Sequence, residues 1–109
     1  MNQPYTVEYL AGATRQLLDI EDYIIDHDAP IYAYDFTTRI ENFCNSLGQF
    51  PRKYTQRFDI WPNLHTVGFE GSVLIAYVVN DDARLITIEG IYYGGQNWEA
   101  ALKSMKFES

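Results

Sequence analysis

The residues that decide the fold are 64–98, with the sequence LHTVGFEGSVLIAYVVNDDARLITIEGIYYGGQNW. Seven apolar residues in a row begin at Val73, and such a run is typical of a strand covered on both faces. Glu70 and Gly71 form a turn before this run, and residues 80–82 (NDD) supply turn-forming side chains after it. Because the flanking residues 64–69 and 84–93 also read as strands, we predict a three-stranded antiparallel meander.

The N-terminal half predicts a strand followed by two helices. Residues 5–9 (YTVEY) are β-branched and aromatic, as in a strand. Apolar residues then recur every three or four positions over residues 11–26 and again after Pro30, which is the period of a buried helical face. Pro30 separates the two helices, since proline disfavours helix at the preceding residue and suits a first turn. The two faces consist of Ala13, Leu17, Ile20 and Ile24, and of Ala33, Phe36, Ile40, Phe43 and Leu47.

These elements predict an α+β fold in a single domain, residues 1–109. An antiparallel helix hairpin packs on one face of a mainly antiparallel sheet of about four strands, in which the first strand pairs with the last in either sense. Gly48 is a plausible stop for the second helix, and residues 52–63 lack a clean period and are predicted as a loop. A short helix begins near Trp98, and residues 103–109 continue it or form a tail.

Composition excludes several functional classes. The chain of 109 residues has a net charge of −7, which opposes a protein that grips nucleic acid directly. No window approaches the roughly 20 apolar residues of a membrane span, and the N-terminus does not resemble a signal peptide. The single cysteine, Cys44, fits a reducing compartment and is predicted to be a buried apolar thiol. We therefore expect a cytoplasmic globular protein.

Four segments resemble the ParE/RelE superfamily of bacterial toxins, and specifically its ParE-like branch. They are YTVEYLAGATRQLLDIEDYI at residues 5–24, SLGQFP at 46–51, RFDIWPNLHTV at 57–67 and IYYGGQNWEAAL at 91–102. Each segment alone is weak, but their order and the final Gly-x-x-x-Trp-Glu are moderately specific. The resemblance implies the toxin of a type II toxin–antitoxin module, neutralised by a cognate, ParD-like antitoxin.

The resemblance leaves three activities open. The ParE-like branch implies inhibition of DNA gyrase by binding, with no bond cleavage, and we expect this activity. The RelE branch implies cleavage of messenger RNA on the ribosome, which needs general acid–base groups and cations. Here Tyr93, Gly94, Gly95 and Gln96 stand where His-Gly-Arg-Arg is common in the family, so this ribonuclease equipment is thin. A third possibility is an attenuated member that binds antitoxin without poisoning a target.

Candidate target contacts combine local basic residues with polar and aromatic residues at the end of the last strand. Large amphipathic rings anchor partners at low entropic cost, although they equally serve a core. The alternation of strand side chains requires that one of Tyr92 and Tyr93 face the helices and the other face away. The candidate target contacts are Arg52, Lys53, Arg57, Arg84, Tyr93, Gln96 and Trp98.

Candidate antitoxin contacts lie mostly in the apolar segment before the meander. So much apolar surface needs a cover, by a partner docking in a groove or at a sheet edge or by the protein itself. Trp61 is the best candidate for exposure. The antitoxin candidates are Phe58, Trp61, Leu64, His65 and Tyr92. His27 and His65 are isolated, so no metal, cofactor or catalytic residue is predicted.

Overall fold

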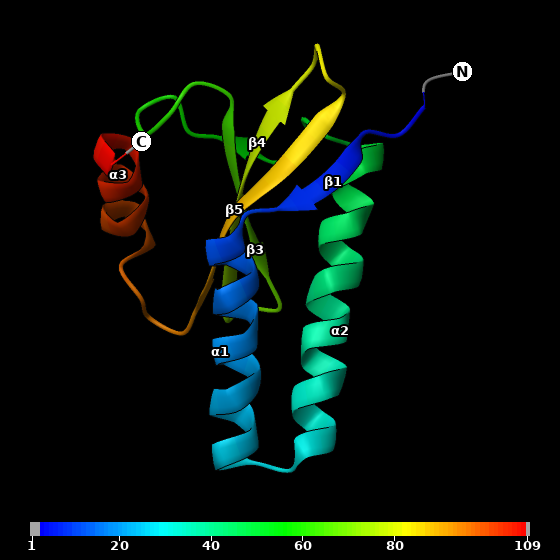
Figure 1. Cartoon of the computed structure of the whole chain (residues 1–109), viewed down its shortest axis with the longest axis vertical. Helices are drawn as coiled ribbons and strands as arrows, with labels where there is room; N and C mark the ends of the chain where they lie inside the picture. Colours follow the sequence, from blue (N-terminus) through cyan, green and yellow to red (C-terminus); the bar gives the residue numbers. More distant parts are fainter. Residues whose placement is uncertain (1–2, 109) are drawn as a thin grey trace.

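The computed structural model describes residues 3–108 and shows a helix hairpin lying along a twisted sheet (Figure 1). Its third helix lies at the side of the sheet, next to a long loop (Figure 1). The elements in chain order are β1 (Thr6–Tyr9), α1 (Ala11–His27), α2 (Pro30–Ser46), the 3-10 turn η1 (Leu47–Gln49), β2 (Thr55–Gln56), β3 (Leu64–Phe69), β4 (Val73–Asn80), β5 (Leu85–Tyr93) and α3 (Trp98–Glu108). This order confirms the predicted fold class.

The helix hairpin forms as the apolar spacing predicts. Ala13 and Ile20 of α1 and Ile40 and Cys44 of α2 are buried in the core that the hairpin shares with the sheet, and Ala33 of α2 is also buried. Pro30 occupies the first turn of α2, where its missing N–H breaks no helical hydrogen bond. The C-terminal segment is helical to Glu108, and Ser109 lies outside the described residues.

The sheet has five strands in the order β1-β5-β4-β3-β2, one more than the sequence predicts. The additional strand, β2, lies within the segment predicted as a loop, where Thr55 pairs with Thr66 and Gln56 with His65. With two residues it is too short for an apolar period to reveal it. The sequence left open the relative direction of the first and last strands, and β1 pairs with β5 in parallel. The other neighbouring strands are antiparallel.

A β-bulge in β5 organises both faces of the sheet. Ala76 pairs with Gly90 and Tyr77 with Ile88, so Glu89 has no partner on β4. The extra residue shifts the alternation. As a result Ile86 and Ile88 before the bulge, and Ile91 and Tyr93 after it, all pack on the helix-hairpin side.

The opposite face carries a second, smaller core under α3 and the loop that follows β2. Ile60 of this loop and Leu102 of α3 pack with Leu64, Ala76 and Tyr92 of the sheet. Both faces of β4 are therefore covered, as its continuous apolar run predicts. Among the described residues, no helix is long and apolar enough to cross a membrane.

Candidate functional site

Two of the predicted basic target contacts, Arg52 and Arg57, form ion pairs within the protein. Arg52 pairs with Asp81, and Arg57 contacts Asp59 at 2.8 Å and Glu99 at 3.0 Å. The Asp59 pKa is lowered by the Arg57 guanidinium, and the Asp81 pKa by the Tyr5 hydroxyl and Arg52. These arginines hold loops together and carry little uncompensated charge.

The two remaining basic candidates differ from each other. Arg84 donates to the carbonyl of Gln3 and lies 4.8 Å from the Tyr5 ring centre. Lys53 is exposed, and its ammonium lies over the rings of Phe50 and Tyr54, at 5.8 and 5.5 Å from their centres. Among the described residues, Lys53 makes no ion pair with an acidic side chain. It is therefore the basic candidate with the most charge available to a partner.

Tyr92 and Tyr93 point to opposite faces, as strand alternation predicts. Tyr92 is 5% exposed in the second core, and Gly90 makes room for it, because a Cβ at position 90 would lie 2.5 Å from its ring. Tyr93 lies on the helix side, with its ring 5.8 Å from Tyr23 and 5.9 Å from Phe36. Trp98 packs on the second core beneath Arg57, whose guanidinium carbon is 5.3 Å from the ring centre.

Burial removes three antitoxin candidates from the surface. Leu64 and His65 are 0% and 1% exposed, and Tyr92 is covered as described, so none of them offers a contact surface in this conformation. The physical reason is that α3 and residues 57–63 close over one face while the helix hairpin covers the other. Phe58, in contrast, is 73% exposed.

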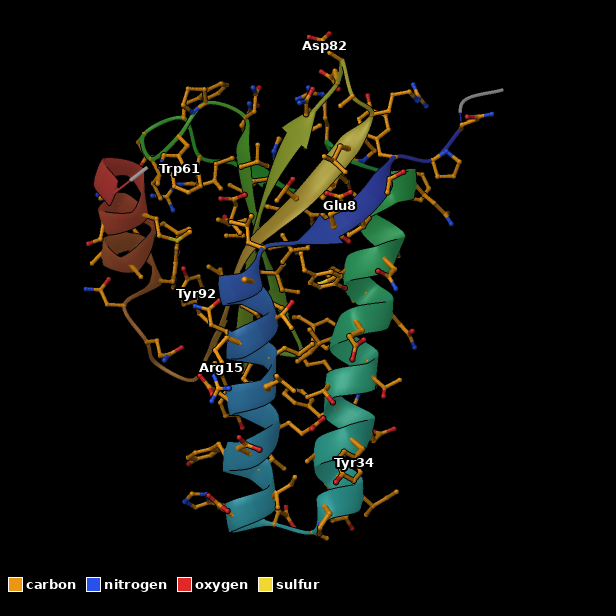
Figure 2. The ribbon with its side chains drawn as sticks, viewed as in Figure 1. Glu8, Arg15, Tyr34, Trp61, Asp82 and Tyr92 are labelled. Atoms are coloured by element: carbon orange, nitrogen blue, oxygen red, sulfur yellow. The ribbon has the colours of Figure 1, made fainter. Side chains whose placement is uncertain are left out.

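Trp61 belongs to the cover of the second core and is only partly exposed. Figure 2 shows it in the loop beside α3. Its indole Nε1 is buried and has no hydrogen-bond partner among the described residues. Within the described residues the indole ring is therefore held by packing and not by a hydrogen bond. Leaving a buried donor without a partner costs about 1–3 kcal/mol.

A furrow between α1 and the end of β5 brings together residues that sequence did not connect. β1 pairs with β5 only as far as Ile88, so the rest of β5 has an edge without a strand beside it. Side chains occupy the amides of this edge: Gln16 Oε1 accepts from Ile91 at 2.8 Å, and Gln96 Oε1 accepts from Tyr93 at 3.1 Å. We call the adjoining cavity of about 390 Å³ the edge furrow; it is lined by Gln16, Asp19, Ile20, Tyr23, Ile91, Tyr93, Gly94 and Gln96.

The edge furrow contains two predicted target candidates, Tyr93 and Gln96, and two residues that sequence analysis missed, Gln16 and Tyr23. Tyr23 had a signal in the sequence, because it is a large aromatic residue outside the predicted apolar face of the helix; in the structure its side chain is 51% exposed. The role of Gln16 had no local signal, since its partner lies 75 residues away.

The two histidines and the bulge glutamate lie in different environments. The His65 ring stacks on Tyr77 at 5.2 Å, and burial lowers its pKa. The exposed His27 contacts the carbonyl of Tyr23 at 2.7 Å through Nδ1. Glu89, at the bulge, is half-buried, and burial raises its pKa. No group of three metal-ligating side chains occurs among residues 3–108.

The architecture is that of small α+β toxins from toxin–antitoxin modules. A ParE-containing structure of the chromosomal ParDE system from P. aeruginosa matches with a TM-score of 0.71 and 19% identity, covering 83% of this chain and 96% of that one. The RelBE2 complex from Mycobacterium tuberculosis matches with a TM-score of 0.60 and 18% identity, covering 84% and 99%. A mutant of the E. coli toxin RelE in the free state matches with a TM-score of 0.67 and 8% identity, covering 95% and 98%.

At the level of sequence, the family model of the ParE toxin of type II toxin–antitoxin system, parDE, matches residues 7–98. The chain therefore belongs to the ParE toxin family, as its four segments predict. No curated protein sequence is significantly similar to it.

Proposed function

We propose that this ParE-type toxin inhibits DNA gyrase by binding to it, and that a cognate antitoxin neutralises it. The observation that carries the proposal is the family match over residues 7–98. A binding mode is supported by the placement of the cations. All five arginines contact acidic side chains or a backbone carbonyl, so their guanidinium charges are less available to stabilise a transferring phosphate.

The remaining contact candidates follow from exposure. Phe58, whose ring is 73% exposed, is the antitoxin contact that we favour. Lys53 is the gyrase contact that we favour, because its charge is unpaired among the described residues, and Gln96 adds a polar group at the edge furrow. An exposed ring and an available charge are what a partner can use without first opening the fold.

Induced expression of the chain in a bacterium tests the activity. Gyrase inhibition predicts filamentation and a DNA-damage response before protein synthesis slows. Rapid translation arrest with cleaved messenger RNA would favour a ribonuclease instead. Normal growth despite abundant folded protein would refute the proposal and indicate an attenuated member. A short neighbouring gene whose product restores growth and binds the chain would support the antitoxin, and a fully toxic chain that no neighbouring product suppresses would count against it.

A supercoiling assay with purified gyrase and purified chain tests the target and the contact together. Lys53→Gln should weaken inhibition several-fold, in line with the loss of one exposed cation at an interface. Lys103→Gln is the matched control, because it removes the same charge from an exposed position on α3. Equal effects of the two substitutions would reject Lys53 as a specific contact.

A further inference from the structure

An aromatic pocket lies where the tip of the helix hairpin meets the end of β5. We call it the hairpin pocket; it is an open cavity of about 330 Å³. Its walls include the rings of Tyr23, Tyr32, Phe36 and Tyr93, the carboxylates of Asp28 and Asp35, and the side chains of His27 and Arg39. The edge-on contacts of Tyr93 with Tyr23 and Phe36 hold the inner wall in place before any partner arrives.

The outer wall of the pocket is uncovered. Tyr32 is 60% exposed and Tyr23 is 51% exposed, which is unusual for two large rings beside one cavity. The faces of such rings carry negative electrostatic potential and attract cations. No lysine or arginine among the described residues lies over Tyr23, Tyr32 or Tyr93, although the His27 ring stacks on Tyr23 at 4.1 Å.

The charge around the pocket is mainly negative, and Arg39, which also lines it, is paired with Asp35 and Glu70. Residues 16–38 contain six acidic side chains and no lysine or arginine. Two of these acids, Asp22 and Asp26, lie in the last turns of α1, where the helix dipole already places partial negative charge. Asp28 follows directly, and one of its oxygens accepts from the amide of Ala29 at 2.8 Å. This concentration repels nucleic acid and anionic lipid and favours a basic protein segment.

At the rim of the pocket, the guanidinium of Arg39 already lies between an aromatic ring and carboxylates. The Arg39 guanidinium carbon lies 5.4 Å from the ring centre of Phe36, while its nitrogens contact Asp35 and Glu70. A cation between a ring and a carboxylate is thus already accommodated on one side. Tyr32 and Asp28 offer the same combination on the other side, where the described residues place no lysine or arginine, and His27 stacks on the neighbouring Tyr23.

We propose that the hairpin pocket binds an arginine or lysine side chain of a basic segment in a partner protein. The cation stacks on Tyr32, beside the Tyr23–His27 pair, and faces the carboxylate of Asp28. This inference goes beyond the proposed function, because the recognition chemistry does not depend on whether the chain poisons gyrase.

The test is an NMR titration of the ¹⁵N-labelled protein at about 0.15 M salt, where long-range attraction between charges is screened. The probe is the peptide acetyl-Ala-Arg-Ala-Ala-Arg-Ala-amide, and the ligand control has glutamine in place of both arginines. Saturable shifts centred on the hairpin pocket, with a Kd in the millimolar range or tighter, are expected for the arginine peptide alone. Shifts spread evenly over the acidic surface, equal shifts with the glutamine peptide, or no saturation at about 10 mM would overturn the proposal.

Matched variants locate the effect. Tyr32→Ala should weaken binding by about three-fold or more, the usual size of a lost cation–ring contact, and Asp28→Asn should do so by a similar factor. Tyr34→Ala is the control: this ring is 51% exposed on the same helix but is outside the lining of the pocket (Figure 2). All three positions are exposed, so the fold should persist, which the spectra themselves report. An equal loss in Tyr34→Ala would refute a specific role for the pocket.

Discussion

Replacing Gly48 with alanine should destabilise the protein strongly, although the substitution adds only one methyl group. Gly48 lies in η1, directly against the start of β1. Its carbonyl accepts from the amide of Tyr5 at 2.8 Å, and a Cβ at position 48 would lie 2.3 Å from the carbonyl oxygen of Tyr5. That neighbour is backbone, so no side-chain rotation relieves the clash, and either η1 or the N-terminal segment must move.

The expected loss of stability combines the cost of the new clash with the loss of one hydrogen bond. Overpacking costs about 1–3 kcal/mol, and the Tyr5–Gly48 hydrogen bond contributes about 0.5–1.5 kcal/mol, so we expect about 1.5–4.5 kcal/mol in total. An unfolding entropy of about 2.1 cal/mol/K per residue gives roughly 0.23 kcal/mol/K for this chain. The Tm of Gly48→Ala should therefore fall by about 7–20 °C.

Thermal unfolding followed by circular dichroism measures this change, and Gly12→Ala provides the control. Gly12 lies in α1, and a Cβ there meets no atom within 4 Å. Because alanine is the better helix former, Gly12→Ala should add about 0.5–1 kcal/mol and raise the Tm. If Gly48→Ala melts within about 3 °C of the parent, the close approach of η1 to β1 is wrong.

Three further predictions concern buried titratable groups. Burial raises the pKa of the Cys44 thiol to about 12, so iodoacetamide at pH 8 should modify the unfolded chain and spare the native one; equal rates by mass spectrometry would contradict its placement. Burial raises the pKa of Glu89, so its ionisation opposes folding above the ordinary carboxyl pKa of about 4.3. Glu89→Gln should therefore raise the Tm at pH 7 and change it little at pH 4, and no gain at pH 7 would argue against the burial. Burial lowers the pKa of His65, so stability should fall as the pH drops below about 6.5, and His65→Phe should flatten that part of the Tm profile; an unchanged slope would assign it to other groups.

The helices and the meander could be predicted from sequence because their apolar residues repeat with the period of the element. The face of α2 from Ala33 to Leu47 and the continuous run of β4 are the strongest examples, and both bury what the pattern says they bury. β2 was not predicted because a strand of two residues is too short to show an alternation of apolar and polar side chains. The bulge at Glu89 escaped because an extra residue leaves the strand composition unchanged and alters only the pairing with β4.

The site was less predictable because its contacts are long-range. Arg52 and Arg57 form a basic group in sequence, but their partners Asp81 and Glu99 lie 29 and 42 residues away and compensate it only in the folded chain. The burial of Leu64 and His65 likewise depends on which segments close over each face. Tyr93 could be placed on one of two faces by alternation, whereas its position between Tyr23 and Phe36 required the packed hairpin.

The unpaired half of β5 has a consequence for how the chain behaves in concentrated solution. A strand edge with free amides is a template on which copies of a protein add to one another and aggregate. The side chains of Gln16 and Gln96 each accept one hydrogen bond, from the amides of Ile91 and Tyr93. These two donors are therefore not available to a strand of a second molecule. Replacing the two glutamines would leave both donors unoccupied, and we expect solubility to fall before stability does.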